Sequence, residues 1–458
     1  MKKWNYDYSQ TFWMKMFLAI PDYPNRRSKV FINFEQALEI IKAADILTRG
    51  IPKIVYLVGW QGLGHDDCFP EMDVINEALK RDCDASARES LYWLYEEAKK
   101  YNTVVSFHGN LSDAYTETPS FPELAAANAL VNDVNGDPAV IEVFNGRDAY
   151  KVSYKGYYES GLFKRQWDSF CEATPVRESG TVHLDNFCLA QSLNPRTSLE
   201  EEDEARNRML DYISSLGIDV TTEYTYREQE WRADTPEHPI RKLYATAVDP
   251  LPVGRPEDAP IRTLGRIAAS WWTSSLTAGD CLEVSPYVYS GRITDTRLLE
   301  VFYGAVHGED IWMDRGWEPQ KWHSEFLHQF CTMQLPYFYL NRHRRLSIEP
   351  DGDGWIASFS DGVRSIGRSA RIEKDGKLLK DGTDVLLPLS ADNRTFMAYS
   401  EKGKKGEWDI PDAAFTDARI FRVTLEGSVP AGEARINGDR ITLECAPGET
   451  LRIEAADR

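Results

Sequence analysis

Apolar positions in the first half of the chain alternate between a helical spacing and short continuous runs. Residues 34–47 carry apolar side chains at helical spacing among charged ones, follow Asn33 as a candidate N-cap, and stop at Gly50. This pattern predicts an amphipathic helix. Residues 53–59 are almost wholly apolar, as a strand buried on both faces of a parallel sheet requires.

The same unit of helix, buried strand and polar tip recurs along the chain. It alternates as a parallel α/β fold does, and its length favours a closed (β/α)8 barrel of the TIM type over an open sheet. The further predicted helices and strands are residues 86–101 with 104–107, residues 162–173 with 181–184, and residues 199–216 with 217–222.

The spacing of apolar residues changes after about Leu346. Helical spacing disappears, and short apolar or alternating runs appear, such as residues 383–389 and 418–424. Asp-Gly and Asn-Gly pairs, which favour hairpin turns, punctuate this region. We therefore predict a catalytic barrel over residues 1–346 and a C-terminal β-sandwich domain over residues 347–458.

Composition narrows the classes of partner. The formal net charge of −19 at pH 7 disfavours nucleic acid and anionic membranes, both of which attract proteins through Lys and Arg. The apolar runs are too short to span a bilayer or to act as a secretory signal. We expect a cytoplasmic protein, although a secreted one without its signal peptide would look the same. The 13 Trp and 22 Tyr could stack on sugars or simply fill a large core.

Polar side chains follow each predicted strand. In a barrel the active site lies at the carboxyl ends of the strands, so these residues are candidates for one site. Asp and Asn at such positions also often cap the next helix. The candidates are His65, Asp66, His108, Asn110, Asp185, Asn186 and Glu223.

Asp185 and Glu223 end consecutive predicted strands, which makes them neighbours around the rim. A retaining glycosidase needs two carboxyl groups about 5 Å apart, one acting as nucleophile and the other as general acid and base. The pair fits this requirement, with Asp185 as nucleophile and Glu223, through a raised pKa, as acid and base.

Other chemistries have weaker support. A metal-dependent barrel hydrolase could use His65, Asp66, His108 and His183 as ligands, but the chain lacks an early His-x-His pair. There is no Gly-x-Ser-x-Gly elbow, Walker A motif or dinucleotide fingerprint, and the seven cysteines form no CxxC pair. We predict no cofactor and no metal.

The chain resembles the catalytic core of the endo-α-N-acetylgalactosaminidases, glycoside hydrolase family 101, and more loosely their exo-acting relatives. The similarity runs over most of the chain. Its carriers are residues 55–61, Gly64-His65-Asp66, Phe107-His108-Gly109-Asn110 with Ala114-Tyr115, His183-Leu184-Asp185, Thr222-Glu223, residues 307–312, Glu325-Phe326, Phe330-Cys331, residues 335–340, Leu386-Leu387-Pro388 and residues 408–411.

This resemblance implies a retaining α-glycosidase acting on α-linked N-acetylgalactosamine-type sugars, derived from O-glycans or mucins, or on galactose-type sugars. It also implies that Asp185 is the nucleophile, Glu223 the acid and base, and His65 and Asp66 sugar-binding residues. Further candidates for sugar contacts are Trp60, His108, Asn110, His183, Trp272 and Glu309, with Trp271 and Trp312 as additional tryptophans.

The family members are typically large and secreted, whereas the sequence of this chain predicts only a barrel and one β domain. Endo and exo cleavage therefore both stay open, as does the exact sugar. The carbohydrate partner is an oligosaccharide or a glycopeptide. A catalytically inactive carbohydrate-binding relative is a third hypothesis, which the two strand-end carboxylates disfavour.

Overall fold

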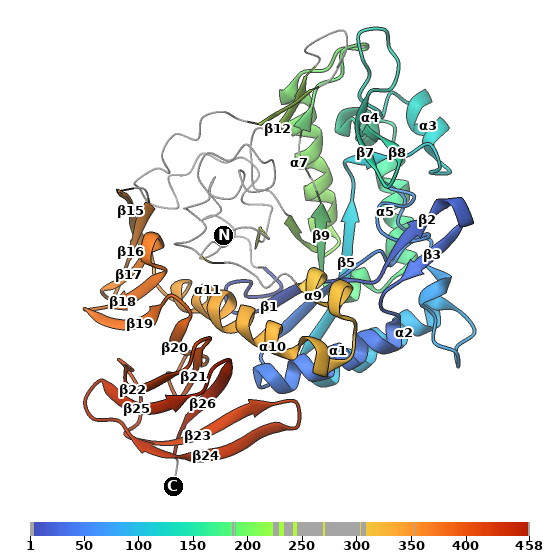
Figure 1. Cartoon of the computed structure of the whole chain (residues 1–458). Coiled ribbons are helices and arrows are strands. Elements are labelled where there is room, and N and C mark those ends of the chain that lie inside the picture. The colour runs from blue at the N-terminus through green and yellow to red at the C-terminus, as the bar shows by residue number, and fades with distance from the viewer. Residues whose placement is uncertain are drawn as a thin grey trace.

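A sheet of six parallel strands lies at the centre of the described structure (Figure 1). This computed structural model describes residues 4–185, 187, 189–222, 229–232, 241–244, 269–270, 303, 308–352 and 354–456. In spatial order the strands are β1 (Phe12–Phe17), β4 (Lys53–Val58), β5 (Thr103–Asn110), β9 (Thr181–Asp185), β11 (Asp219–Thr222) and β14 (Ala269–Ser270).

A helix connects most consecutive strands of this sheet. The sequence explains where two of them begin, because Asn33 with Gln36 and Ser198 with Glu201 form capping boxes that satisfy free backbone N–H groups. These helices lie close to the predicted positions. They are α1 (Phe34–Thr48), α2 (Ala87–Ala98), α5 (Leu162–Ala173) and α7 (Leu199–Ser215).

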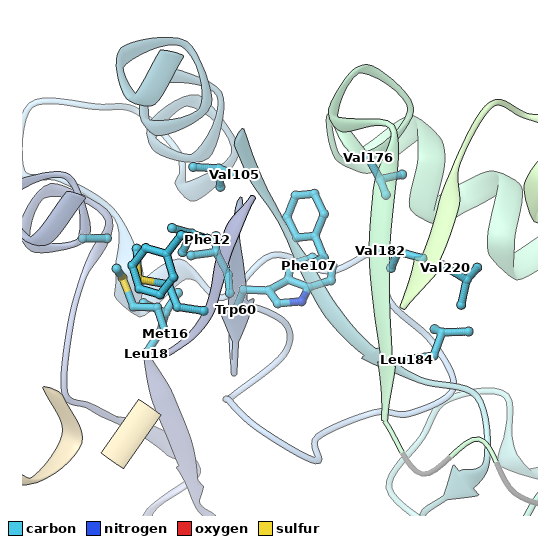
Figure 2. Close-up of a cluster of buried hydrophobic side chains, with 14 of the residues drawn as sticks. Phe12, Met16, Leu18, Trp60, Val105, Phe107, Val176, Val182, Leu184 and Val220 are labelled. Carbon is cyan, nitrogen blue, oxygen red and sulfur yellow. The ribbon is translucent and has the colours of Figure 1, made fainter. Parts of the chain in front are cut away.

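Alternate side chains of the strands serve two different faces. One set, including Phe107, Val182 and Leu184, belongs to a large buried apolar cluster that also contains residues of the surrounding helices (Figure 2). The other set includes Trp13, Tyr56 and His183, which pack on one another. This division follows from the two-residue period of a strand.

The sheet is strongly curved. From β1 to β9 there are three strand spacings, or about 14 Å in a flat sheet. The rings of Trp13 on β1 and His183 on β9 are nevertheless centred 6.2 Å apart. Trp13, Tyr56 and His183 therefore lie on the concave side, as in the interior of a barrel.

The segment before β1 packs at the amino ends of the strands. The Tyr8 and Tyr56 hydroxyls both lie 2.8 Å from the Thr181 hydroxyl at the start of β9. The Asn5 backbone N–H donates to the Asp219 carboxylate at the start of β11, with an N···O distance of 2.6 Å. This segment therefore covers the amino ends of β9 and β11.

Short elements are inserted between the main strands and helices. Two of the strands form a hairpin, β2 (Ala19–Asp22) with β3 (Arg27–Val30). One small sheet contains, in spatial order, β6 (Asp113–Ala114), β8 (Arg147–Lys151) and β7 (Val140–Phe144). A second small sheet contains β10 (Leu189–Ala190), β12 (Gln229–Arg232) and β13 (Arg241–Tyr244). The helices are α3 (Phe121–Ala126), α4 (Tyr154–Glu159) and α6 (Val176–Ser179).

Three helices lead from the barrel to the C-terminal domain: α9 (Gly308–Arg315), α10 (Pro319–Gln329) and α11 (Leu335–Leu340). The Phe326 and Phe330 rings contact Phe12 of β1 at 5.7 and 5.5 Å between centroids. His328 Nδ1 lies 3.0 Å from the Tyr399 hydroxyl of the C-terminal domain. These helices therefore join the two parts of the molecule.

The C-terminal residues form an antiparallel β domain, orange to red in Figure 1. A ten-stranded sheet packs with a two-stranded sheet around a second apolar core that includes Phe396, Trp408 and Ile453. The larger sheet contains, in spatial order, β15 (Arg345–Asp351), β16 (Gly354–Phe359), β17 (Val363–Ile366), β18 (Arg371–Lys374), β19 (Lys377–Asp381), β20 (Asp384–Pro388), β21 (Thr395–Ser400), β26 (Glu449–Ala455), β23 (Asp417–Thr424) and β24 (Gly427–Arg435), and the smaller contains β22 (Lys404–Asp409) and β25 (Arg440–Cys445).

The predicted fold class is confirmed: a parallel sheet with surrounding helices precedes an antiparallel β domain. The prediction of eight barrel strands extends to residues outside those described. Among the described helices, none is both long and apolar enough to cross a membrane.

Gly59, directly after β4, is required where two backbone segments meet. Its φ is +73°, and an added Cβ would lie 2.1 Å from the Ala19 carbonyl oxygen. We expect Gly59→Ala to lower the free energy of unfolding by roughly 3 kcal/mol, through backbone strain and this clash. Urea-induced unfolding followed by fluorescence measures the change.

Gly146 offers a matched control for that substitution. Its φ is +74°, but no atom lies within 4 Å of an added Cβ. Gly146→Ala therefore carries the backbone term alone, about 1 to 2 kcal/mol. Equal losses in the two variants would show that the contact with Ala19 is not important.

Candidate active site

Three consecutive strands of the sheet bring the predicted side chains together at their carboxyl ends. His108 and Asn110 lie at the end of β5, and Asp185 is the last residue of β9. In the pairing of these strands, Asn110 lies opposite Asp185 and His108 opposite His183. His65 comes from the loop that follows β4. The backbone N–H of His65 donates to the Ala19 carbonyl at 2.9 Å.

His65, His108 and Asp185 form a compact cluster. His108 Nε2 lies 3.5 Å from Asp185 Oδ2. The imidazole rings of His65 and His108 meet edge to face, with centroids 5.2 Å apart. The side chain of His108 is buried, whereas those of His65 and Asp185 are partly exposed. The carboxylate at the end of β9 is thus accessible to a ligand and has an imidazole beside it.

The same three side chains could also hold a cation. One potential ligand atom from each lies within 4.8 Å of the other two. Two imidazoles and a carboxylate are a donor set that suits zinc and similar ions. The arrangement therefore fits either a nucleophile with polar neighbours or a metal centre.

Asp66 lies next to this cluster in a strained turn. Its φ is +61°, a left-handed conformation that is uncommon for residues other than glycine. One carboxylate oxygen lies 3.4 Å from His65 Nε2, and the side chain is largely buried. His65 and Asp66 thus present their polar atoms as a pair.

His183 lies below the cluster, toward the interior of the barrel. It is fully buried, its ring is 5.5 Å from that of His108, and its Nδ1 is 2.8 Å from the Thr221 hydroxyl. Burial, with smaller contributions from Lys15 and His108, holds its pKa well below the usual range. A neutral ring in this position supports His108 from beneath.

Trp60 and Asn110 are both buried. The Trp60 indole packs against Phe107 (Figure 2) and against Phe170. Its N–H donates to the His108 carbonyl at 2.9 Å. The Asn110 carboxamide accepts hydrogen bonds from the backbone N–H groups of Ser112 and Asp113. In this structure both side chains contact protein groups that shape the site.

Several predicted residues lie outside the described part of the site. Glu223 and Trp272 are not among the described residues, nor are Asn186 and Trp271; for Glu309, only its place in α9 is described. Trp312 is buried, and its ring meets that of Trp322 at 5.7 Å.

The structure adds Tyr115 and Arg147, neither of which we proposed as a site residue from the sequence. The Tyr115 hydroxyl is buried without a hydrogen-bond partner among the described residues. Burial, followed by the negative charges of Asp66 and Asp113, raises the pKa of Tyr115 well above its usual value, and Asp185 contributes in the same direction. This phenol keeps its proton and can donate it in a hydrogen bond.

The position of these residues coincides with a family match. Residues 23–235 match the model of the endo-alpha-N-acetylgalactosaminidase family, a range that includes His65, His108, Asp185 and Glu223. This region is therefore similar to that family of glycoside hydrolases. The curated proteins contain no significant match to the chain.

Two solved structures of glycoside hydrolases are similar to this chain. The α-N-acetylgalactosaminidase NagBb of Bifidobacterium bifidum is 12% identical with a TM-score of 0.48, over 80% of this chain and 57% of that one. The GH36 α-galactosidase AgaA of Geobacillus stearothermophilus is 11% identical with a TM-score of 0.39, over 97% and 55%. The chain thus spans little more than half the length of these proteins.

Proposed function

We propose that the protein is a retaining α-glycosidase that cleaves α-linked N-acetylgalactosamine-type sugars from O-glycans or mucins, or galactose-type sugars. Asp185 is the nucleophile and Glu223 the general acid and base of a double displacement. Both residues lie within the region that matches the glycoside hydrolase family. The carbohydrate substrate is an oligosaccharide or a glycopeptide.

The main support is the position of the Asp185 carboxylate. It ends a buried parallel strand, lies at the barrel rim where catalytic groups of this fold gather, and remains partly exposed. His108 Nε2 lies 3.5 Å from Oδ2, so an imidazole flanks the carboxylate. An accessible carboxylate is what attack on an anomeric carbon needs.

The strand register supports the choice of Glu223 as the second carboxylate. Thr222, which precedes it, pairs with Leu184, which precedes Asp185. Neighbouring strands lie about 4.8 Å apart, which is close to the separation of about 5 Å that retaining enzymes need. Glu223 protonates the departing oxygen and then activates water against the glycosyl-enzyme intermediate.

His65 and Asp66 are proposed to bind the hydroxyl groups of the sugar that is cleaved off. Their polar atoms adjoin the Asp185 carboxylate through the contact between the His65 and His108 rings. The Tyr115 hydroxyl has no hydrogen-bond partner among the described residues, and its pKa is raised by burial and by the charges of Asp66, Asp113 and Asp185, so it offers a further donor. Several hydrogen bonds in a partly dry site give orientation as well as affinity.

The proposal is tested with aryl α-glycosides of N-acetylgalactosamine, of galactose and of the galactosyl-β-1,3-N-acetylgalactosamine disaccharide. We expect turnover of at least one, with the α-anomer of the sugar appearing first in proton NMR spectra. A β-anomer as first product would exclude the retaining mechanism. Preference for the disaccharide would indicate endo cleavage, and preference for a monosaccharide exo cleavage.

A metal-dependent hydrolase is a second candidate because of the His65, His108 and Asp185 cluster. It predicts stoichiometric zinc in the purified protein and loss of activity to chelators. We expect hydrolysis of the aryl glycosides to survive extended dialysis against EDTA. An inactive sugar-binding relative would instead bind the monosaccharides in calorimetry without hydrolysing any glycoside.

A further inference from the structure

Arg147 occupies an unusual position for an arginine. It directly follows the turn Asn145-Gly146, whose φ values of 50° and 74° suit a tight hairpin between β7 and β8. Its side chain is 7% exposed. Burying a guanidinium group costs free energy unless the group is paired. The contacts of the Arg147 guanidinium therefore indicate its role.

Two tyrosine rings enclose the guanidinium group. Its central carbon lies 4.0 Å from the centroid of Tyr23 and 4.1 Å from that of Tyr115. Tyr23 belongs to the segment between β2 and β3, and Tyr115 follows β6. Cations on aromatic faces in buried sites are held firmly, so Arg147 is fixed between two separate insertions of the barrel.

The polar edge of the guanidinium reaches the loop that carries His65 and Asp66. Nη2 donates a hydrogen bond to the Asp66 carbonyl oxygen. Nη1 donates to Glu117 Oε2 at 3.2 Å and lies 3.8 Å from Asp67 Oδ1. Arg147 thus contacts the backbone of one proposed sugar-binding residue and the side chain next to it.

Asp67 extends this connection through the loop. Its carboxylate accepts hydrogen bonds from the Tyr23 hydroxyl and from the Leu63 backbone N–H, each at 2.8 Å. Both Asp66 and Cys68 adopt left-handed backbone conformations, with φ of 61° and 63°. Such a loop keeps its shape only where surrounding contacts hold it.

We propose that Arg147 is a positioning residue that holds residues 62–68 in the conformation that presents His65 and Asp66 to the Asp185 site. The inference rests on the proposed function for its effect on catalysis. It couples the β7–β8 hairpin, 81 residues away in sequence, to sugar binding. A displacement of the loop by about 1 Å is enough to cost roughly 100-fold in rate.

The test compares Arg147→Ala and Arg147→Lys with the wild type. We expect kcat/KM on the aryl glycosides to fall by about 10- to 100-fold in the alanine variant and less in the lysine variant, which keeps the charge but not the fork of donors. Added guanidinium chloride at low millimolar concentration should restore part of the activity of Arg147→Ala alone. A purely structural role predicts no such rescue.

A second measurement does not depend on activity. Hydrogen exchange, measured by mass spectrometry on peptides covering residues 60–68, should become faster in Arg147→Ala. The matched control is Arg165→Ala, because Arg165 makes an exposed bidentate pair with Glu123 in α3. We expect wild-type exchange and wild-type kcat/KM in that control.

The outcomes separate this inference from the proposed function. A wild type that hydrolyses none of the glycosides defeats the proposed function, and loop exchange then decides the holding role of Arg147. Exchange like that of the wild type in Arg147→Ala overturns the inference. So does a lower melting temperature accompanied by unchanged kcat/KM well below that temperature.

Discussion

Asp185→Asn should lower kcat/KM on every aryl α-glycoside that the wild type cleaves by at least about 1,000-fold, or about 4 kcal/mol of transition-state stabilisation. The carboxamide keeps the shape of the carboxylate but cannot form the glycosyl-enzyme bond. The contact between His108 Nε2 and Oδ2 at 3.5 Å leaves room for the substitution without a clash. Steady-state kinetics measures the loss.

An added nucleophile makes the test specific for the role of Asp185. In Asp185→Ala, azide can occupy the vacated space and attack the α-glycoside directly, so a β-glycosyl azide should form. Asp148→Asn, an exposed position on β8, serves as the control and should match the wild type. Full activity in Asp185→Asn would remove this residue from the catalytic role.

Glu223→Gln should lower kcat by about 100- to 10,000-fold on substrates with poor leaving groups, because it removes general acid and base catalysis. For a dinitrophenyl glycoside, whose leaving group needs no proton, the substitution should slow formation of the glycosyl-enzyme intermediate much less. Rates across a series of aryl leaving groups reveal this dependence.

Azide distinguishes the two carboxylates. In Glu223→Ala it should attack the intermediate after Asp185 has reacted, so the product is an α-glycosyl azide, opposite to that of Asp185→Ala. Glu200→Gln, exposed on α7, is the matched control. A leaving-group dependence like that of the wild type would argue against Glu223 as the acid.

The sequence predicted β4, β5, β9 and β11, but not β1. That strand contains Lys15, which is buried and influences the pKa of His183. A charged side chain on the interior face breaks the continuous apolar run that marks β4. Sequence pattern records the average environment of a strand and does not show that one polar side chain points into a barrel.

The role of Trp60 depends on partners that the sequence does not identify. A tryptophan after a barrel strand can stack on a sugar or pack in the core. In this structure the ring of Phe170 in α5, 110 positions away in the sequence, covers the Trp60 ring, so Trp60 packs in the core. Burial of a large side chain is a property of the packed helices and strands rather than of local sequence.

Arg147 shows the same limit for a polar residue. The Asn145-Gly146 pair could have predicted the hairpin, because such turns favour these two residues. The sandwich between Tyr23 and Tyr115 could not have been predicted, since its members come from two separate insertions, the β2–β3 hairpin and the sheet of β6, β7 and β8. Only folding brings the guanidinium to the Asp66 carbonyl.

The sequence by itself determined the alternation of helices and strands and the presence of an antiparallel β domain after them, and it offered a candidate set of polar residues at strand ends. It could do so because secondary structure follows local periodicity and because parallel strands end at one edge of a sheet. The tertiary structure decided which of those residues meet, placing His65, His108 and Asp185 in contact while Trp60 and Asn110 became buried supports. Distances between side chains depend on strand register, curvature and long-range packing, which no local pattern encodes.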